Sequence, residues 1–321
     1  MRLFPPRHVP QGPEEWSESG IRAMKVSLAG LGATAALQVV IVALTGSVAV
    51  LSDTIHNLSD ALTAVPLWIA FAMGRREADR RFTYGYHRAE DLAGLVIVAA
   101  IALSGVGVVW ESVRRLLDPR ALEGAGWVVV AGVIGAAGNE WVARYRMRVG
   151  RAIGSEALVA DGHHARTDAL TSLAVVASGL GSLLGVPWAD PVAGLAIGAV
   201  ILLLLRQTAR RVFGRLMDVV DPDLLERLGH LIGGVAGVEA VTLLRTRWAG
   251  HRLLTEVAVE VDPSLTVADG HDICEEVRHR VFHDLPYRVE VLVHLDPRPG
   301  DQDPHARTAH HGRAGRRPGV G

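Results

Sequence analysis

The sequence predicts a membrane-embedded all-α bundle of six transmembrane helices, followed by a C-terminal cytoplasmic α+β domain. Two observations predict this fold. Of the 321 residues, 49% are hydrophobic and 21% are charged, and the mean hydropathy of +0.25 is high for so many charges. The charges are segregated, since residues 21–206 are apolar with short polar interruptions, whereas the chain from Asp218 onward has the composition of a soluble domain.

Six apolar segments are each about as long as the roughly 20 residues that a helix needs to cross a bilayer. Arginine-rich segments follow the second, fourth and sixth of them, so the positive-inside rule places both termini in the cytoplasm. We therefore expect an N-terminal cytoplasmic segment over 1–20 and a transmembrane domain over 21–213. The expected spans are 21–45, 48–73, 89–117, 126–145, 155–184 and 188–205.

The N-terminus lacks the charged-then-apolar layout of a cleaved signal, so we expect the first span to remain in the mature protein. The compact length and the lack of an organelle-type signal favour a bacterial inner membrane. The expected protein is thus an integral, multi-pass membrane protein in contact with lipid.

After residue 213 the pattern changes to short elements that are typical of a soluble α+β domain. Thr266 and Asp269 have the spacing of a capping box at the start of its second helix. From 298 to 321 the chain has almost no apolar residues, and we expect a disordered tail. In the domain over 214–297 we expect the order αββαβ: helix 222–231, strands 241–248 and 253–261, helix 267–282 and strand 288–295.

Composition and motifs exclude several other classes of protein. A net charge of −1 gives no argument for nucleic-acid binding, and no Walker-type Gly-Lys-Ser/Thr sequence indicates ATP. Cys274 is the single cysteine, which excludes an internal disulfide and a cysteine-based zinc site; we expect it to be a small core residue. Gly194 and Gly198 lie four apart in the sixth span, where we interpret them as helix-packing positions.

Two of the expected spans carry a histidine followed four residues later by an aspartate. The pairs are His56 with Asp60 in the second span and His164 with Asp168 in the fifth. Residues four apart on a helix lie on one face, one turn apart. Because an ionisable side chain in hydrocarbon is costly unless it faces a partner or a water-filled path, we expect the two pairs to face each other. Two imidazole nitrogens and two carboxylate oxygens suit a four-coordinate divalent cation such as zinc, cobalt or cadmium.

This ligand set couples metal binding to proton binding. Imidazoles bind metal only when neutral, so metal loading releases protons and protonation expels metal. The pattern therefore favours a secondary transporter that exports Zn²⁺ from the cytoplasm in exchange for protons. Two alternatives use the same ligands: a metal-sensing membrane protein and an intramembrane metalloenzyme. A fourth interpretation is that the side chains only hydrogen-bond between helices.

Three further ionisable residues accompany these pairs. Asp53 and Asp161 each precede their pair by three residues, and they either line the ion path or pair with arginines. His163 adjoins His164 but points about 100° away around the helix, so we do not count it as a ligand.

The last strand of the soluble domain suggests a second metal site. Alternation places Glu290, His294 and Asp296 on one face of this strand and the aliphatic residues between them on the core face. We interpret His294 and Asp296 as one corner of a metal site, with His271 as the third ligand and His251 as a candidate fourth. A zinc ion there would have a structural or regulatory role. The alternative is a set of solvated side chains on the domain surface.

From residue 21 to residue 297 the chain resembles the cation diffusion facilitator family of zinc and related divalent-metal transporters. The resemblance rests on the six spans, the His/Asp pairs on the second and fifth, and the soluble domain that follows. The segment 82–90, FTYGYHRAE, is similar to the signature that opens the family's third span, and 291–297, VLVHLDP, is similar to its last cytoplasmic strand.

The resemblance implies a homodimer that exports zinc by proton antiport, with a metallochaperone-like cytoplasmic domain at the dimer contact. It also implies that His56, Asp60, His164 and Asp168 form the transport site, in the version that is associated with zinc. Some members carry an additional metal site in the loop between the second and third spans. This chain has Asp79 and a displaced His87 there, so we do not expect that site.

Overall fold

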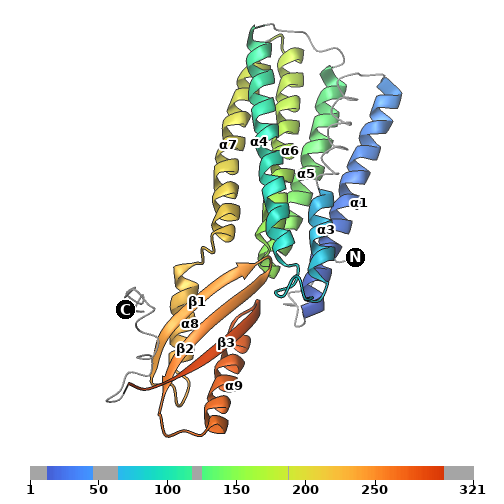
Figure 1. Ribbon diagram of the computed structural model, residues 1–321. Coiled ribbons are helices and arrows are strands. Elements are labelled where there is room, and N and C mark those ends of the chain that lie inside the picture. Colours follow the sequence, from blue (N-terminus) through green and yellow to red (C-terminus); the bar gives the residue numbers. More distant parts are fainter. Residues whose placement is uncertain (1–12, 46–63, 118–124, 187, 300–321) are drawn as a thin grey trace. The chain divides into compact units, whose positions relative to one another are not determined.

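The computed structural model describes residues 13–45, 64–117, 125–186 and 188–299 (Figure 1). The chain divides into two compact units, Met1–Phe213 and Gly214–Gly321. In the described residues the first unit is helical and the second combines helices with a sheet. His56, Asp60 and Asp53 lie outside the described residues, as do most of the expected N-terminal segment and of the tail.

The described helices of the first unit lie over the expected spans, but three of them extend further than the apolar pattern does. The first begins at Pro13 instead of residue 21, and two others continue at their C-terminal ends. The fourth span was expected to end at residue 145 and the sixth at residue 205, yet both helices run on through their arginine-rich ends. Arginine is a good helix former, so a helix does not stop where its apolar sequence stops. The described helices are α1 (Pro13–Thr45), α3 (Ala64–Gly74), α4 (Arg88–Leu117), α5 (Ala125–Ile153), α6 (Glu156–Leu183) and α7 (Ala189–Leu216).

Four of these helices are long and apolar enough to cross a membrane. They are the helical segments Glu18–Leu44, Arg88–Leu117, Ala125–Ile153 and Pro191–Leu216, and only 22–44% of the most apolar window of each is buried in the structure. Most of the apolar surface therefore faces outward, as a lipid-exposed surface must. The described part of the second span, α3, is a shorter apolar helix, and α6 is 28 residues long but carries the polar residues of the candidate site.

Helix α6 lies between α4 and α5, with α1 on the far side of α5 (Figure 1). Glycines let the backbones of α5 and α6 approach closely. A Cβ atom on Gly162 would lie 3.0 Å from the Met147 amide nitrogen, and one on Gly179 would lie 3.1 Å from the Ala125 carbonyl oxygen. Such small residues are what packed membrane helices use at their contacts. The two contacts hold α6 against α5 on both sides of His164.

Helix α7 packs against α4 through the glycines that the sequence analysis singled out. A Cβ atom on Gly198 would lie 2.7 Å from the Val109 side chain, and one on Gly194 would overlap the Ser112 hydroxyl. The interpretation of Gly194 and Gly198 as packing positions is therefore confirmed.

The loop between α3 and α4 is organised around Asp79. Its Oδ1 accepts hydrogen bonds from the backbone N–H groups of Arg81 and Phe82, both at 2.7 Å. Its Oδ2 accepts one from the Tyr86 hydroxyl at 2.6 Å. The bond from Tyr86 and the two backbone bonds hold the pKa of Asp79 below its usual value, and the same bond raises the pKa of Tyr86. Both carboxylate oxygens of Asp79 are thus hydrogen-bonded within the loop.

The second unit has the predicted αββαβ order. Strands β1 and β2 pair antiparallel, β2 and β3 pair in parallel, and β2 is central. The parallel pairing follows from the helix that connects β2 to β3. The elements are α8 (Pro222–Gly233), β1 (Ala240–Ala249), β2 (Arg252–Val261), α9 (Val267–Asp284) and β3 (Arg288–Pro297).

Both helices of this unit pack on one face of the sheet. Leu228 of α8 and Val277 of α9 share a buried cluster with Leu253 and Val257 of β2. The predicted capping box is present, since Thr266 and Asp269 bond each other's backbone N–H groups. The predicted core face of β3 is also confirmed, because its members all lie in or against this cluster: Val289, Val291, Val293 and Leu295.

Cys274 on α9 is only half-buried, so the expectation of a core cysteine is not met in full. Helix α9 covers the sheet with one face. Cys274 lies at the border of that face, so its side chain is partly exposed. Burial nevertheless raises the pKa of the Cys274 thiol, which makes it a poor nucleophile.

We predict that Gly162→Ala lowers the melting temperature of the detergent-purified protein. The new methyl group would meet the Met147 and Ala143 backbone at 3.0 and 3.1 Å, and overpacking of this kind costs about 1–3 kcal/mol. Gly107→Ala on α4 is the matched control, because nothing lies within 4 Å of its Cβ position and alanine is the better helix former. Equal melting temperatures for the two variants would contradict the packing described for α5 and α6.

We also predict that Asp79→Ala accelerates tryptic cleavage of the loop after Arg80 and Arg81. Without the carboxylate, two backbone N–H groups and the Tyr86 hydroxyl lose their acceptor, and locally opened segments are the preferred targets of proteases. Glu77→Ala, which removes an exposed acid of the same loop, should cleave at the wild-type rate. Equal rates for Asp79→Ala and the wild-type protein would show that Asp79 does not close the loop.

Candidate metal centre

His164 and Asp168 form a buried pair on α6. They lie one turn apart, with Nδ1 of His164 3.8 Å from Oδ1 of Asp168, and they are 2% and 4% exposed. This separation is too long for a hydrogen bond. Two ligand atoms on a tetrahedral zinc ion lie about 3.3 Å apart, given bond lengths near 2.0–2.1 Å. The pair therefore needs only a small side-chain adjustment to hold one cation between its two donor atoms.

Three hydroxyl groups of α6 and its N-cap make local hydrogen bonds around this pair. Ser155 caps the start of α6 by accepting a hydrogen bond from the Leu158 N–H at 3.1 Å. The Thr167 hydroxyl donates to the His164 carbonyl at 2.6 Å, and the Thr171 hydroxyl donates to the Thr167 carbonyl at 2.9 Å. Both hydroxyl protons are thus donated to carbonyls of the same helix. The imidazole of His164 and the carboxylate of Asp168 remain the candidate ligands on this turn, as their side-chain types suit a zinc ion.

Asp161, one turn before His164, pairs with an arginine. Nη1 of Arg146 on α5 lies 2.9 Å from Oδ2 of Asp161, and the two side chains are only 2% and 0% exposed. The sequence left two roles open for Asp161, and the structure favours the ion pair. Sequence reasoning placed Arg146 in the arginine-rich border that follows the fourth span. That placement is wrong, because α5 continues to Ile153 and carries this arginine on its packed face.

A second ion pair joins the same two helices nearer to the surface. Arg166 of α6 holds Glu140 of α5 in a two-pronged contact, with distances of 3.1 and 2.8 Å, and both side chains are about one-third exposed.

His163 is buried, and neither of its ring nitrogens has a hydrogen-bond partner among the described residues. His163 and Arg166 lie on faces of α6 other than that of His164.

In the second unit, His294 and Asp296 are in contact as predicted. Nε2 of His294 lies 3.1 Å from Oδ1 of Asp296, and the two side chains are 67% and 9% exposed. Strand alternation places both on the sheet face opposite to Leu295, which belongs to the helix-covered core. The structure thus brings together two of the four residues predicted for this metal site.

The other two predicted ligands of that site are not brought to it. His294 pairs in register with Ala258, seven residues after His251, so His251 lies roughly 23 Å away along β2. His271 belongs to α9, which packs on the opposite face of the sheet, where Gly270 meets Leu295. Across the described ranges no three His, Cys, Asp or Glu residues lie close enough to hold a metal ion together. The four-ligand site expected from the sequence is therefore not assembled within one chain.

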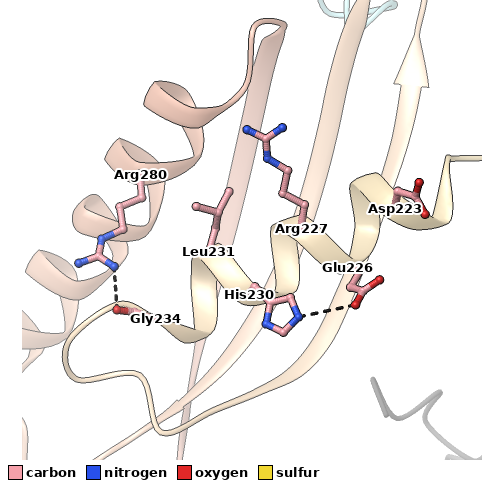
Figure 2. A pocket seen from close by; sticks show the side chains of 7 residues that line it. All are labelled: Asp223, Glu226, Arg227, His230, Leu231, Gly234 and Arg280. Carbon is pink, nitrogen blue, oxygen red and sulfur yellow. Dashed lines mark hydrogen bonds and ion pairs between the residues drawn. The ribbon is translucent and has the colours of Figure 1, made fainter.

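The second unit also has an open groove between α8 and α9, of about 540 Å³ (Figure 2). Its charged groups bond to their neighbours: Arg280 donates to the Gly234 carbonyl at 2.7 Å, and His230 lies 3.7 Å from Glu226. Because these side chains are exposed and already paired, the groove does not have the features of a metal or catalytic site.

Comparisons with known proteins agree with this arrangement. Residues 24–217 match the family model of the cation efflux transmembrane domain, and residues 220–298 match that of the cation efflux protein cytoplasmic domain. A probable cation efflux system protein of Mycobacterium tuberculosis is 51% identical over 283 residues, which cover 88% of this chain and 85% of that protein. Metal tolerance protein C1 of Arabidopsis thaliana is 29% identical over 311 residues, with coverages of 90% and 65%.

Two further matches are a more distant relative and a solved structure. The magnetosome protein MamB of Paramagnetospirillum magneticum is 24% identical, with 80% of this chain and 87% of that protein covered. A solved structure of a MamM-CTD variant is 31% identical and covers 24% of this chain and 96% of its own, with a TM-score of 0.23. That score is too low to support a structural inference.

The two family models together span both units, and the first of them alone covers more than half of the chain. The relative from Mycobacterium tuberculosis has a comparable length and half of its residues in common with this chain. The chain belongs to the cation efflux family: it is a multi-pass membrane transporter that moves divalent metal cations out of the cytoplasm, and it is not an enzyme.

Proposed function

We propose that this transporter exports Zn²⁺ in exchange for protons through a site made by His56, Asp60, His164 and Asp168. The observation that carries the proposal is the buried pair of His164 and Asp168, whose donor atoms lie 3.8 Å apart. A buried imidazole and carboxylate held at that spacing form one half of a four-ligand tetrahedron. The same His-x-x-x-Asp spacing in the second span supplies the other half.

Zinc is favoured by the donor chemistry. A mixed set of two nitrogens and two oxygens suits zinc, which has no strong geometric demand, and it also admits cobalt and cadmium. Manganese and iron prefer sites with more oxygen ligands. The names of the relatives, cation efflux and metal tolerance proteins, are consistent with such a substrate.

Proton coupling follows from the same ligands. On the cytoplasmic side the cation binds neutral imidazoles and ionised carboxylates, and any protons on these groups leave as it binds. When the site opens to the other side, protons compete for the ligands and release the cation. Alternating exposure of one site to the two faces is the usual cycle of secondary transporters.

We further propose a homodimer in a bacterial inner membrane, with both termini in the cytoplasm. The arginine-rich ends of α5 and α7 support this orientation through the positive-inside rule. A regulatory or structural zinc ion in the cytoplasmic unit would use His294 and Asp296 and would need ligands beyond this pair.

We predict that Asp168→Ala and His164→Ala each abolish zinc uptake into proteoliposomes, with at least a hundredfold loss of rate, while leaving a folded protein. Each removes one of four ligands, so the cation would lack a donor in a site shielded from water. Ser178→Ala is the matched control, because it removes another buried polar group from α6 and should transport at the wild-type rate. Zinc flux is measured with a lumenal indicator, and folding is checked by gel filtration.

Normal flux in Asp168→Ala would contradict the site assignment. If the wild-type protein binds zinc but carries no flux under any pH gradient, the sensor hypothesis replaces that of the transporter.

A further inference from the structure

The pair of Arg146 and Asp161 is the most deeply buried ion pair among the described residues. Its side chains are 2% and 0% exposed, whereas those of Arg166 and Glu140 between the same helices are 32% and 28% exposed. Removing two charges from water costs more than their attraction commonly returns, so a buried ion pair is weak evidence for a stabilising role. Two nitrogens of Arg146, Nε and Nη2, have no hydrogen-bond partner in the described chain, which increases that cost.

The contact between α5 and α6 does not require this pair. The two backbones already meet at Gly162, one residue from Asp161, and again at Gly150, where a Cβ atom would lie 2.9 Å from the Val159 amide nitrogen. Apolar side chains of the two helices fill the space between these levels, among them Met147 and Val159. An apolar pair at positions 146 and 161 would fit such an interface at lower cost, which indicates that the charges themselves have a role.

The position of Asp161 on α6 indicates an electrostatic role for the pair. Asp161 precedes His164 by three residues on α6, which puts the two side chains on neighbouring turns of one face, and both are buried. A carboxylate at this place adds a negative charge beside the candidate ligands, and the guanidinium of Arg146 cancels it. The pair as a whole therefore adds no net charge beside His164 and Asp168.

We propose that Arg146 and Asp161 form a charge-balancing pair that sets the affinity of the transport site for its divalent cation. This proposal rests on the assignment of His164 and Asp168 to that site. The pair keeps the electrostatic potential at the site negative enough for a cation to bind, but not so negative that the cation cannot be released. Neither residue binds the metal; both act through the charge that they present to it.

The proposal predicts opposite consequences for the two halves of the pair. Asp161→Asn leaves the guanidinium uncompensated, and an arginine does not lose its proton in a protein. The cation is then repelled, and the apparent KM for zinc should rise roughly tenfold or more, since a unit charge a few ångströms away in a poorly screened site has at least that effect. Arg146→Gln removes the positive charge, so its KM should not rise above the wild-type value.

The decisive variant is the double substitution Arg146→Gln with Asp161→Asn, which restores neutrality without restoring the ion pair. Its KM should return to within about threefold of the wild-type value, because the charge at the site is again balanced. If the pair served only to hold the helices together, both single variants would be impaired, Arg146→Gln as well as Asp161→Asn, because each leaves one buried charge without its partner. A KM for the double variant equal to that of Asp161→Asn would therefore overturn the proposal, and so would a raised KM in Arg146→Gln.

Two controls complete the zinc-uptake experiment in proteoliposomes. Glu140→Gln leaves Arg166 unpaired between the same helices, but solvent screens that charge, so its KM should stay at the wild-type value; a rise equal to that of Asp161→Asn would overturn the proposal. Arg146→Lys keeps the positive charge on a different side chain and should hold KM near the wild-type value.

The variant His164→Ala distinguishes a failure of the proposed transport site from a failure of the charge-balancing role. If it transports normally, the transport site itself is wrongly assigned. If it is inactive while the Asp161→Asn and double variants share one KM, only the charge-balancing role fails.

Discussion

The cost of a charge inside a membrane determines how the first unit is organised. An ionisable side chain among apolar helices persists only beside a partner or along an ion path, and α6 buries Asp161, His164 and Asp168 within two turns. Asp161 is neutralised by Arg146. His164 and Asp168 lie beside each other at a distance that a shared cation would bridge. The remaining features of this unit can be understood as the means of holding these groups in place.

The packing of the unit is suited to that task. Close backbone contacts at Gly162 and Gly179 fix α6 against α5 at both ends of the site, and the apolar bulk of the bundle is directed outward. The hydroxyls of Thr167 and Thr171 donate to carbonyls of their own helix, so these side chains are held against the backbone of α6.

The sequence predicted what periodicity and spacing determine, and missed what depends on tertiary contacts. Alternation in residues 288–297 was sufficient to find the core face of β3, and the i,i+4 rule was sufficient to place His164 beside Asp168. The burial of Arg146 was not predictable, because Arg144 and Arg148 lie two residues away on either side and nothing in the sequence marks the one that faces α6. The positions of His251 and His271 depend on strand register and on which sheet face α9 covers, and a single strand pattern contains neither.

The most direct test of the central claim follows zinc and pH together in the lumen of proteoliposomes that contain the wild-type protein. With zinc added outside and a proton gradient directed outward, the account predicts zinc accumulation accompanied by a rise in lumenal pH, and both changes should slow when the gradient is collapsed. Zinc accumulation that proceeds at the same rate without any gradient, and with no change of lumenal pH, would contradict exchange for protons at the His and Asp ligands.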